Sequence, residues 1–222
     1  MLRDFHLPPL KGGAPACAVI FLHGLGDRGD GGLLSIGQMW QRALPDCEFF
    51  CPDAPFPFDV APPDFGGKQW FSLSDLSPAS TAEGVLTAAP ILNDYIDHIL
   101  AIRNLTADRL AIVGFSQGTM MALQVAPRRD QTVACVIGYS GLLAMPEKLA
   151  VEKKSAPPVL LVHGTADEVV PFTHMAEAER YLKAAEIPIR TVACPMVTHT
   201  IDETGLREGL AFLLENFKNS TR

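Results

Sequence analysis

Short apolar runs alternate along this chain with longer segments in which apolar residues recur at helical spacing. A short run that is apolar throughout is typical of a strand buried on both faces of a sheet. By this pattern we predict strands at residues 16–22, 48–51, 109–113, 132–137, 159–162 and 189–193. Helices are predicted at residues 35–44, 80–103, 117–125, 173–186 and 202–217. The segment 53–80, rich in proline and aromatic residues, is predicted to be irregular.

Strands that alternate with helices in this way predict an α/β fold, with a mostly parallel sheet and helices on both of its faces. A chain of 222 residues is long enough for a substantial core, and we expect a single domain over residues 1–222. A capping box is predicted to open the helix 80–103 at Ser80 and Glu83, and Pro90 is predicted to kink or split it. In such folds ligands bind beyond the carboxyl ends of the strands.

Composition narrows the classes of partner. Apolar residues make up 48% of the sequence, which excludes a disordered chain. The net charge of −7 and the lack of a Lys- or Arg-rich run argue against nucleic acid and anionic membranes. Residues 1–10 lack the features of a secretion signal, and no stretch reads as long enough to span a bilayer. We therefore expect a cytoplasmic protein without a stable membrane anchor, and the sequence leaves a homodimer open.

The cysteines are five in number, an odd count, and lie mostly in apolar runs: Cys17, Cys47, Cys51, Cys135 and Cys194. This pattern indicates buried free thiols in a reducing compartment. Cys47 and Cys51 are four residues apart, but no second pair completes the spacing of a zinc site. We therefore expect no metal and no cofactor.

The segment Gly114-Phe115-Ser116-Gln117-Gly118 carries the most informative chemical signal. An apolar run precedes it at 110–113, and a helix-forming run follows at 119–124. A strand that turns this sharply into a helix holds the central serine out at the sheet edge in a strained backbone conformation. The flanking glycines let strand and helix pass close together. Ser116 is therefore the candidate nucleophile of a nucleophile elbow.

A serine hydroxyl needs a base to take its proton and an acid to orient that base. With a nucleophile elbow, the order along the chain is serine, acid, histidine. His199 lies between the last predicted strand and the last helix and is the preferred base, with His174 as the alternative. Asp167 lies just past the predicted strand 159–162 and is the preferred acid, with Glu168 as the runner-up.

The tetrahedral intermediate of acyl transfer carries an oxyanion, which two backbone N–H groups must face. Gln117, the residue after the nucleophile, supplies one of them at the start of a helix. The segment His23-Gly24-Leu25-Gly26-Asp27 follows the first predicted strand, and its glycines allow a backbone amide to turn inward. We place the second donor at Leu25, while the local sequence is also compatible with a plain turn.

These motifs, with Val169-Val170-Pro171 after Asp167, resemble the phospholipase/carboxylesterase family, to which acyl-protein thioesterases belong. The resemblance spans residues 16–215 and extends to Trp70 and Phe71. It implies a compact α/β-hydrolase fold with little or no lid. It also implies hydrolysis of carboxylic esters or thioesters by a triad with two oxyanion donors: Ser116, Asp167 and His199, with Leu25 and Gln117.

Some positions depart from the family pattern. Thr119 stands where a second glycine is frequent, Ser72 stands where an aspartate is common, and residues 195–198 lack the family's glycines. These differences remove no catalytic group, but they bear on the shape of the acyl pocket.

The apolar residues of the segment 53–80 are candidates for the acyl pocket: Phe56, Phe58, Phe65, Trp70, Phe71, Leu73 and Leu76. The segment follows a strand whose carboxyl end is expected on the active side of the sheet. The alternative is that these aromatic residues only anchor the loop to the core, and for Phe56 and Phe58 the two interpretations are equally open. Trp70, with Phe71 beside it, is preferred for the pocket because the resemblance places it near the site. Met120 and Val170 are expected to line the pocket floor.

The preferred function is that of a serine carboxylesterase acting on short-to-medium acyl esters through an acyl-enzyme on Ser116. An acyl-protein thioesterase or a lysophospholipase would use the same groups on a different acyl carrier. A non-enzymatic binding protein with the hydrolase fold is the alternative from another class, but such proteins usually lose a triad residue. The expected partner is a small-molecule ester or thioester.

Overall fold

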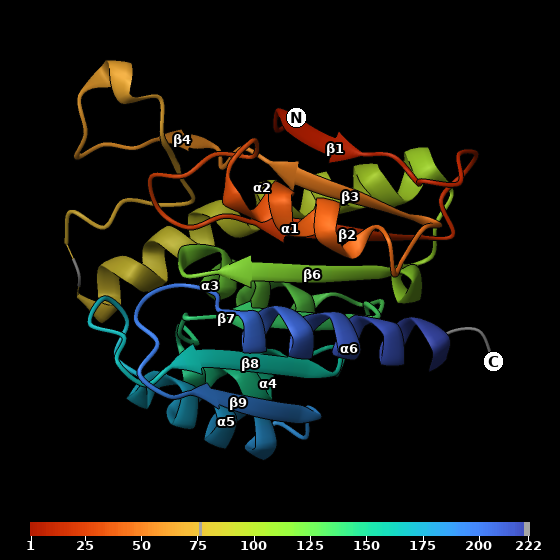
Figure 1. Cartoon of the computed structure of the whole chain (residues 1–222). Coiled ribbons are helices and arrows are strands. Elements are labelled where there is room, and N and C mark those ends of the chain that lie inside the picture. The colour runs from red at the N-terminus through yellow and green to blue at the C-terminus, as the bar shows by residue number, and fades with distance from the viewer. Residues whose placement is uncertain (76, 220–222) are drawn as a thin grey trace.

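The computed structural model describes residues 1–75 and 77–219 and is organised around a seven-stranded sheet (Figure 1). The strands of this sheet follow the order β1-β3-β2-β6-β7-β8-β9. Their bounds are β1 (Asp4–Leu7), β2 (Cys17–Leu22), β3 (Cys47–Pro52), β6 (Leu110–Phe115), β7 (Cys135–Tyr139), β8 (Val159–Gly164) and β9 (Ile189–Cys194). The helices are α1 (Gly32–Trp40), α2 (Pro78–Arg103), α3 (Gln117–Val125), α4 (Leu149–Glu152), α5 (Thr173–Ala184) and α6 (Glu203–Asn219).

The predicted α/β fold is confirmed, and the six predicted strands are the six parallel strands of the sheet. The five predicted helices are also present, with ends shifted by up to four residues. β1 was not predicted, because its four residues mix polar and apolar side chains and it pairs antiparallel with β3 at the sheet edge. Within the segment predicted to be irregular, β4 (Phe56–Pro57) and β5 (Lys68–Gln69) form a short hairpin.

Two apolar layers cover the two faces of the sheet. Neighbouring residues of a strand point to opposite faces, and the inner strands, such as β2 and β6, are apolar at almost every position. Ile20 and Leu22 pack in one layer with residues of α2, α3 and α5. Val19 and Phe21 pack in the other layer with residues of α1 and α6, which lie in front of the sheet in Figure 1. Because all six parallel strands run the same way, their carboxyl ends meet at one edge.

The start of α2 differs from the prediction. The helix begins at Pro78, and the Ser77 hydroxyl accepts a hydrogen bond from the Ser80 N–H at 3.2 Å. The capping box predicted at Ser80 was therefore wrong, because Pro78 fills the first helical position, where proline is favoured. Pro90 does not split the helix. Pro90 and Leu86 are both exposed, so water can bind the carbonyl that proline leaves without a partner.

The prediction that no stretch is long enough to span a bilayer was wrong for α2. Its 26 residues include a window of mean hydropathy 1.2, so by length and composition it could cross a membrane. The core helix of a soluble protein passes the same test, and α2 buries Val85, Leu92 and Ile96 in the core.

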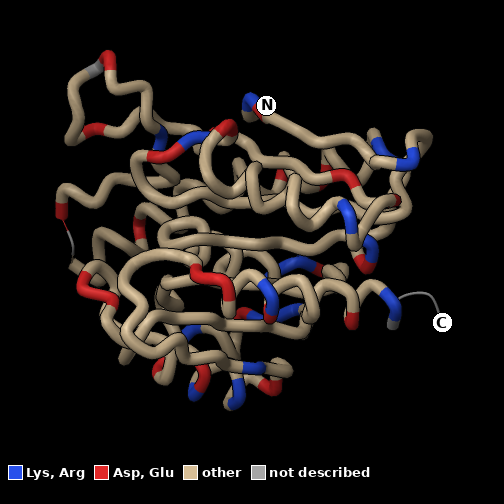
Figure 2. The backbone as a smooth tube through the Cα atoms, viewed as in Figure 1, with Lys and Arg blue, Asp and Glu red and all other residues tan. Residues whose placement is uncertain are grey.

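Acidic and basic residues are interspersed along the backbone (Figure 2). The five cysteines are buried and free, as predicted. Burial raises the pKa of Cys51 and Cys135, so these thiols stay protonated at neutral pH. In the described part of the chain, no three His, Cys, Asp or Glu side chains gather in a way that could hold a metal ion.

Candidate active site

Ser116 occupies a sharp turn between β6 and α3, at the carboxyl edge of the sheet. Its backbone angles, φ 53° and ψ −117°, lie in a region that non-glycine residues rarely adopt. The turn is possible because two glycines let the backbones approach. A Cβ on Gly118 would lie 1.9 Å from the Leu22 carbonyl oxygen, and one on Gly114 would lie 2.5 Å from the Gly118 carbonyl. The strained conformation of Ser116 is stabilised by a hydrogen bond, which its N–H donates to the Tyr139 carbonyl oxygen at 2.9 Å.

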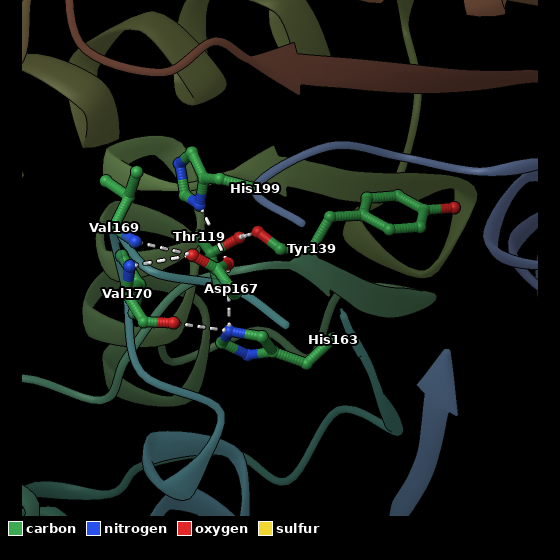
Figure 3. A network of polar contacts seen from close by, with 7 residues as sticks. All are labelled: Thr119, Tyr139, His163, Asp167, Val169, Val170 and His199. Carbon is green, nitrogen blue, oxygen red and sulfur yellow. Dashed lines mark hydrogen bonds and ion pairs between the residues drawn. The ribbon is translucent and has the colours of Figure 1, made fainter. Parts of the chain in front are cut away.

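Asp167 and His199 meet across two neighbouring loops. Asp167 follows β8, and His199 lies between β9 and α6. The His199 Nδ1–H donates to Asp167 Oδ2 at 2.8 Å (Figure 3). The other carboxylate oxygen, Oδ1, accepts hydrogen bonds from the N–H groups of Val169 and Val170, each at 2.9 Å. This pairing fixes the histidine with its proton on Nδ1 and leaves Nε2 free to accept one.

Hydrogen bonds keep the Asp167 carboxyl ionised. Burial alone would raise the pKa of this carboxyl, but the hydrogen bonds from His199, Val170 and Val169 outweigh it and hold the pKa below its usual range. Glu168, the alternative acid, points into solvent. Asp167 is therefore a fixed negative charge beside His199 across the neutral pH range.

The two loops are also joined through their backbones. The Ala166 N–H donates to the Val197 carbonyl at 3.0 Å, and the Thr165 N–H donates to the Cys194 carbonyl at 2.9 Å. Gly164, the last residue of β8, permits this contact because a Cβ there would lie 2.2 Å from the Val197 oxygen. The loops that carry Asp167 and His199 are thus joined by both backbone and side-chain hydrogen bonds.

Ser116 and His199 line the same cavity, of about 590 Å³. This volume lies within the range of small-molecule sites. The cavity wall is mostly apolar, and its members are Gly24, Leu25, Asp27, Leu73, Thr81, Phe115, Ser116, Met120, Leu142, Val169, Val170, Pro171, His174 and His199. In this unliganded structure no hydrogen bond joins Ser116 to His199; such contacts often tighten only when substrate binds. His174, the alternative base, lies on the cavity wall 3.4 Å from Glu177 and does not contact Asp167.

Two backbone N–H groups near Ser116 have no hydrogen-bond partner among the described residues. One belongs to Gln117, in the first turn of α3, where helix geometry leaves N–H groups unpaired. The other belongs to Leu25, which lines the cavity. Its loop is held by the Gly26 N–H, which donates to the Lys68 carbonyl at 2.8 Å. The positive end of α3 adds to the attraction for an anion here.

Comparison with known proteins agrees with this arrangement. Residues 11–216 match the family model described as Phospholipase/Carboxylesterase. The chain belongs to the phospholipase/carboxylesterase family. It is 32% identical over 178 residues to acyl-protein thioesterase 1 of Schizosaccharomyces pombe, covering 76% of each chain.

Solved structures show the same fold. The crystal structure of esterase PE8 is 36% identical, has a TM-score of 0.91, and matches over 96% of this chain and 98% of its own. The crystal structure of Zea mays acyl-protein thioesterase 2 is 25% identical, has a TM-score of 0.75, and matches over 98% of this chain and 100% of its own. The fold is therefore that of the α/β-hydrolases, and the protein is a serine hydrolase.

The family's tryptophan does not contact the cavity in this chain. Trp70 is completely buried, and neither it nor Phe71 lines the cavity. The expectation that they hold the acyl chain is corrected, because both are turned toward the core and the elbow. Within the segment 53–80, Leu73 does line the cavity, whereas Leu76 lies outside the described residues. Met120 and Val170 also line the cavity, as predicted.

Trp70 instead joins the two segments that carry the unpaired N–H groups. Its backbone N–H donates to the Gln117 side-chain oxygen at 2.8 Å, and its indole N–H donates to the His23 carbonyl at 3.1 Å. The Gln117 side-chain nitrogen donates in turn to the Phe71 carbonyl at 2.8 Å. His23 directly follows β2, is buried, and accepts a hydrogen bond from the Ala54 N–H. This contact braces the loop that follows β2.

We expect Trp70→Ala to lower the free energy of unfolding by about 3–5 kcal/mol, because it empties a large buried site. Activity should fall by the same factor for acetate and for longer acyl esters, since the side chain does not contact the cavity. Trp70→Phe is the matched control: it keeps an aromatic ring but loses the hydrogen bond to His23, at a cost of about 1 kcal/mol. Denaturant unfolding and kcat/KM across a chain-length series test this, and a selective loss for long chains would contradict it.

Thr119, where the family often has glycine, ties the elbow to the sheet. Its hydroxyl lies 2.9 Å from the Gly114 carbonyl oxygen, on β6. It lies at the same distance from the Tyr139 carbonyl oxygen, on β7 (Figure 3). Its side chain fills space beside Gly138 and Gly141, where an added Cβ would lie 2.5 and 2.4 Å from Thr119 atoms. The sequence shows that threonine replaces the usual glycine at position 119, but only the packing shows that Gly138 and Gly141 make room for its side chain.

Proposed function

We propose that this protein is a carboxylesterase that hydrolyses short-to-medium acyl esters through an acyl-enzyme on Ser116. The observation that carries the proposal is the hydrogen bond of His199 to Asp167 at 2.8 Å, with His199 lining the same cavity as Ser116. We also propose that residues 1–222 form one catalytic domain acting in the cytoplasm, where buried free thiols stay reduced.

In the proposed reaction, Ser116 Oγ attacks the acyl carbon while its proton passes to Nε2 of His199. Asp167 stabilises the imidazolium that forms. The oxyanion accepts hydrogen bonds from the N–H groups of Leu25 and Gln117. His199 then gives the proton to the departing oxygen or sulfur, which leaves the acyl group on Ser116. Water attacks this acyl-enzyme in the same way, with His199 again as the base, and the carboxylic acid product is released. No metal or cofactor takes part in these steps.

The cavity wall supports an acyl chain as the group that binds there. Leu73, Met120, Leu142, Val170 and Pro171 present apolar surface beside the serine. Each methylene that enters such a wall contributes about 0.8 kcal/mol. We therefore expect kcat/KM to rise by up to about fourfold per added carbon, from acetate to medium-length chains, until the cavity is full.

A thioesterase or lysophospholipase activity is the second candidate, because named relatives of this chain are acyl-protein thioesterases. Nitrophenyl esters of increasing chain length, run beside an acyl thioester and a lysophospholipid of matched acyl length, separate these possibilities. A higher kcat/KM for the ester supports the carboxylesterase, and a preference for either other carrier replaces it. A flat response to chain length would contradict the proposed acyl cavity.

Labelling by a serine-reactive fluorophosphonate tests the nucleophile itself. The wild-type chain should be labelled at Ser116, and peptide mapping identifies the modified residue. Labelling at another serine would contradict the assignment of Ser116, even if esters are hydrolysed.

A further inference from the structure

We infer that His163 is a positioning residue for Asp167, holding the acid and the adjoining cavity wall through one N–H group. His163 ends the apolar part of β8, and its side chain is 2% exposed. This inference rests on the proposed function, because it assigns His163 a role through the acid of the triad.

The contacts fix the proton of His163. Its Nε2 lies 2.8 Å from the Val170 carbonyl oxygen, which can only accept a hydrogen bond (Figure 3). Nε2 therefore carries hydrogen, and the same nitrogen lies 3.2 Å from Asp167 Oδ2. A single N–H thus faces two oxygens of the loop that follows β8.

Each oxygen of Asp167 is consequently held from two sides. Oδ1 accepts hydrogen bonds from the N–H groups of Val169 and Val170. Oδ2 accepts one from His199 and faces Nε2 of His163. Without His163, Oδ2 keeps only its hydrogen bond to His199 among the described residues, so the carboxylate has more freedom to tilt about its bond to Cβ. A displacement of about 1 Å at such a group can lower the rate about 100-fold.

The position of His163 is fixed by packing and by its strand. Its ring lies edge-on to Phe172 with centroids 5.9 Å apart. Its own backbone is in β8, in register with Ala193 of β9. Because the same N–H also contacts the Val170 carbonyl oxygen, His163 links Asp167 to the cavity wall at Val170.

The test compares His163→Gln with His163→Asn. A glutamine places its amide nitrogen near the position of Nε2, whereas an asparagine has the same chemistry but is one methylene too short. We expect His163→Gln to retain kcat within about threefold and His163→Asn to lose about tenfold or more, with KM within about twofold in both. His163→Phe keeps the ring shape without the N–H and should resemble the asparagine variant.

Thermal unfolding of each variant shows whether it is folded, and the glutamine–asparagine comparison carries the test if the phenylalanine variant does not fold. Equal activity of all variants and wild type would overturn the inference, as would an equal loss in the glutamine and asparagine variants. A change confined to KM would also overturn it. Asp167→Asn separates the two proposals: if that variant keeps full activity the proposed function fails, whereas if it is inactive and His163→Asn is unaffected, only this inference fails.

Discussion

Replacing Ser116 by alanine should lower kcat for ester hydrolysis by at least about 10⁴-fold and abolish fluorophosphonate labelling. The substitution removes one hydroxyl that makes no hydrogen bond among the described residues, so the free energy of unfolding should change by less than about 1 kcal/mol. Steady-state kinetics and denaturant unfolding measure the two effects. Turnover near that of the wild type would show that another residue is the nucleophile.

A second substitution, Ser116→Gly, tests whether the backbone at this position is strained. Glycine adopts the observed φ of 53° and ψ of −117° without the strain that a side chain brings. We expect this variant to be equally inactive but more stable than Ser116→Ala, by about 1 kcal/mol, after the larger entropy of an unfolded glycine is counted. Equal stability of the two variants would mean that the strain at this position only offsets the larger entropy of the unfolded glycine.

Asp167→Asn should lower kcat by about 10⁴-fold while leaving the fold intact. An asparagine amide can still accept hydrogen bonds from Val169 and Val170 through its oxygen. Its nitrogen would then face His199 Nδ1, and because both groups are donors, the histidine must shift its proton to Nε2. In that form it cannot take a proton from Ser116. The loss should therefore appear in kcat more than in KM.

Glu168→Gln is the matched control for this substitution, because it makes the same chemical change at the next residue. Glu168 is exposed, so we expect its activity to stay within about twofold of the wild type. If the glutamine variant is inactive and Asp167→Asn is active, the acid has been assigned to the wrong residue of the pair.

The pairing of Asp167 with His199 could be anticipated because each follows a strand of a parallel sheet. The carboxyl ends of such strands share one edge, and chain order then leaves few candidates. The inner strands β2, β3, β6, β7 and β8 were predictable because burial on both faces makes nearly every position apolar. β1 lies at the edge of the sheet, where that rule does not apply, and its pattern gave no signal.

Trp70 and His163 show what sequence pattern cannot supply. An aromatic residue on a loop near the site has the same hydrophobicity whether it faces a cavity or the core. Trp70 is held by Gln117, 47 residues away, and no local pattern reports that contact. His163 directly follows a predicted strand, so a polar residue in that place was a signal, but its two oxygen partners appear only once the loop is folded.

The loop from Asp167 to Val170 limits where substrate preference can be re-engineered. Val170 contributes its side chain to the cavity, its N–H to Asp167 and its carbonyl to His163. A mutant library that diversifies this loop would therefore sample many inactive sequences. Leu73 and Leu142 line the same cavity from elsewhere in the chain. Among the described residues, neither forms a hydrogen bond with Ser116, Asp167 or His199. Saturation mutagenesis at these two leucines should yield the larger share of active variants with altered acyl-chain preference.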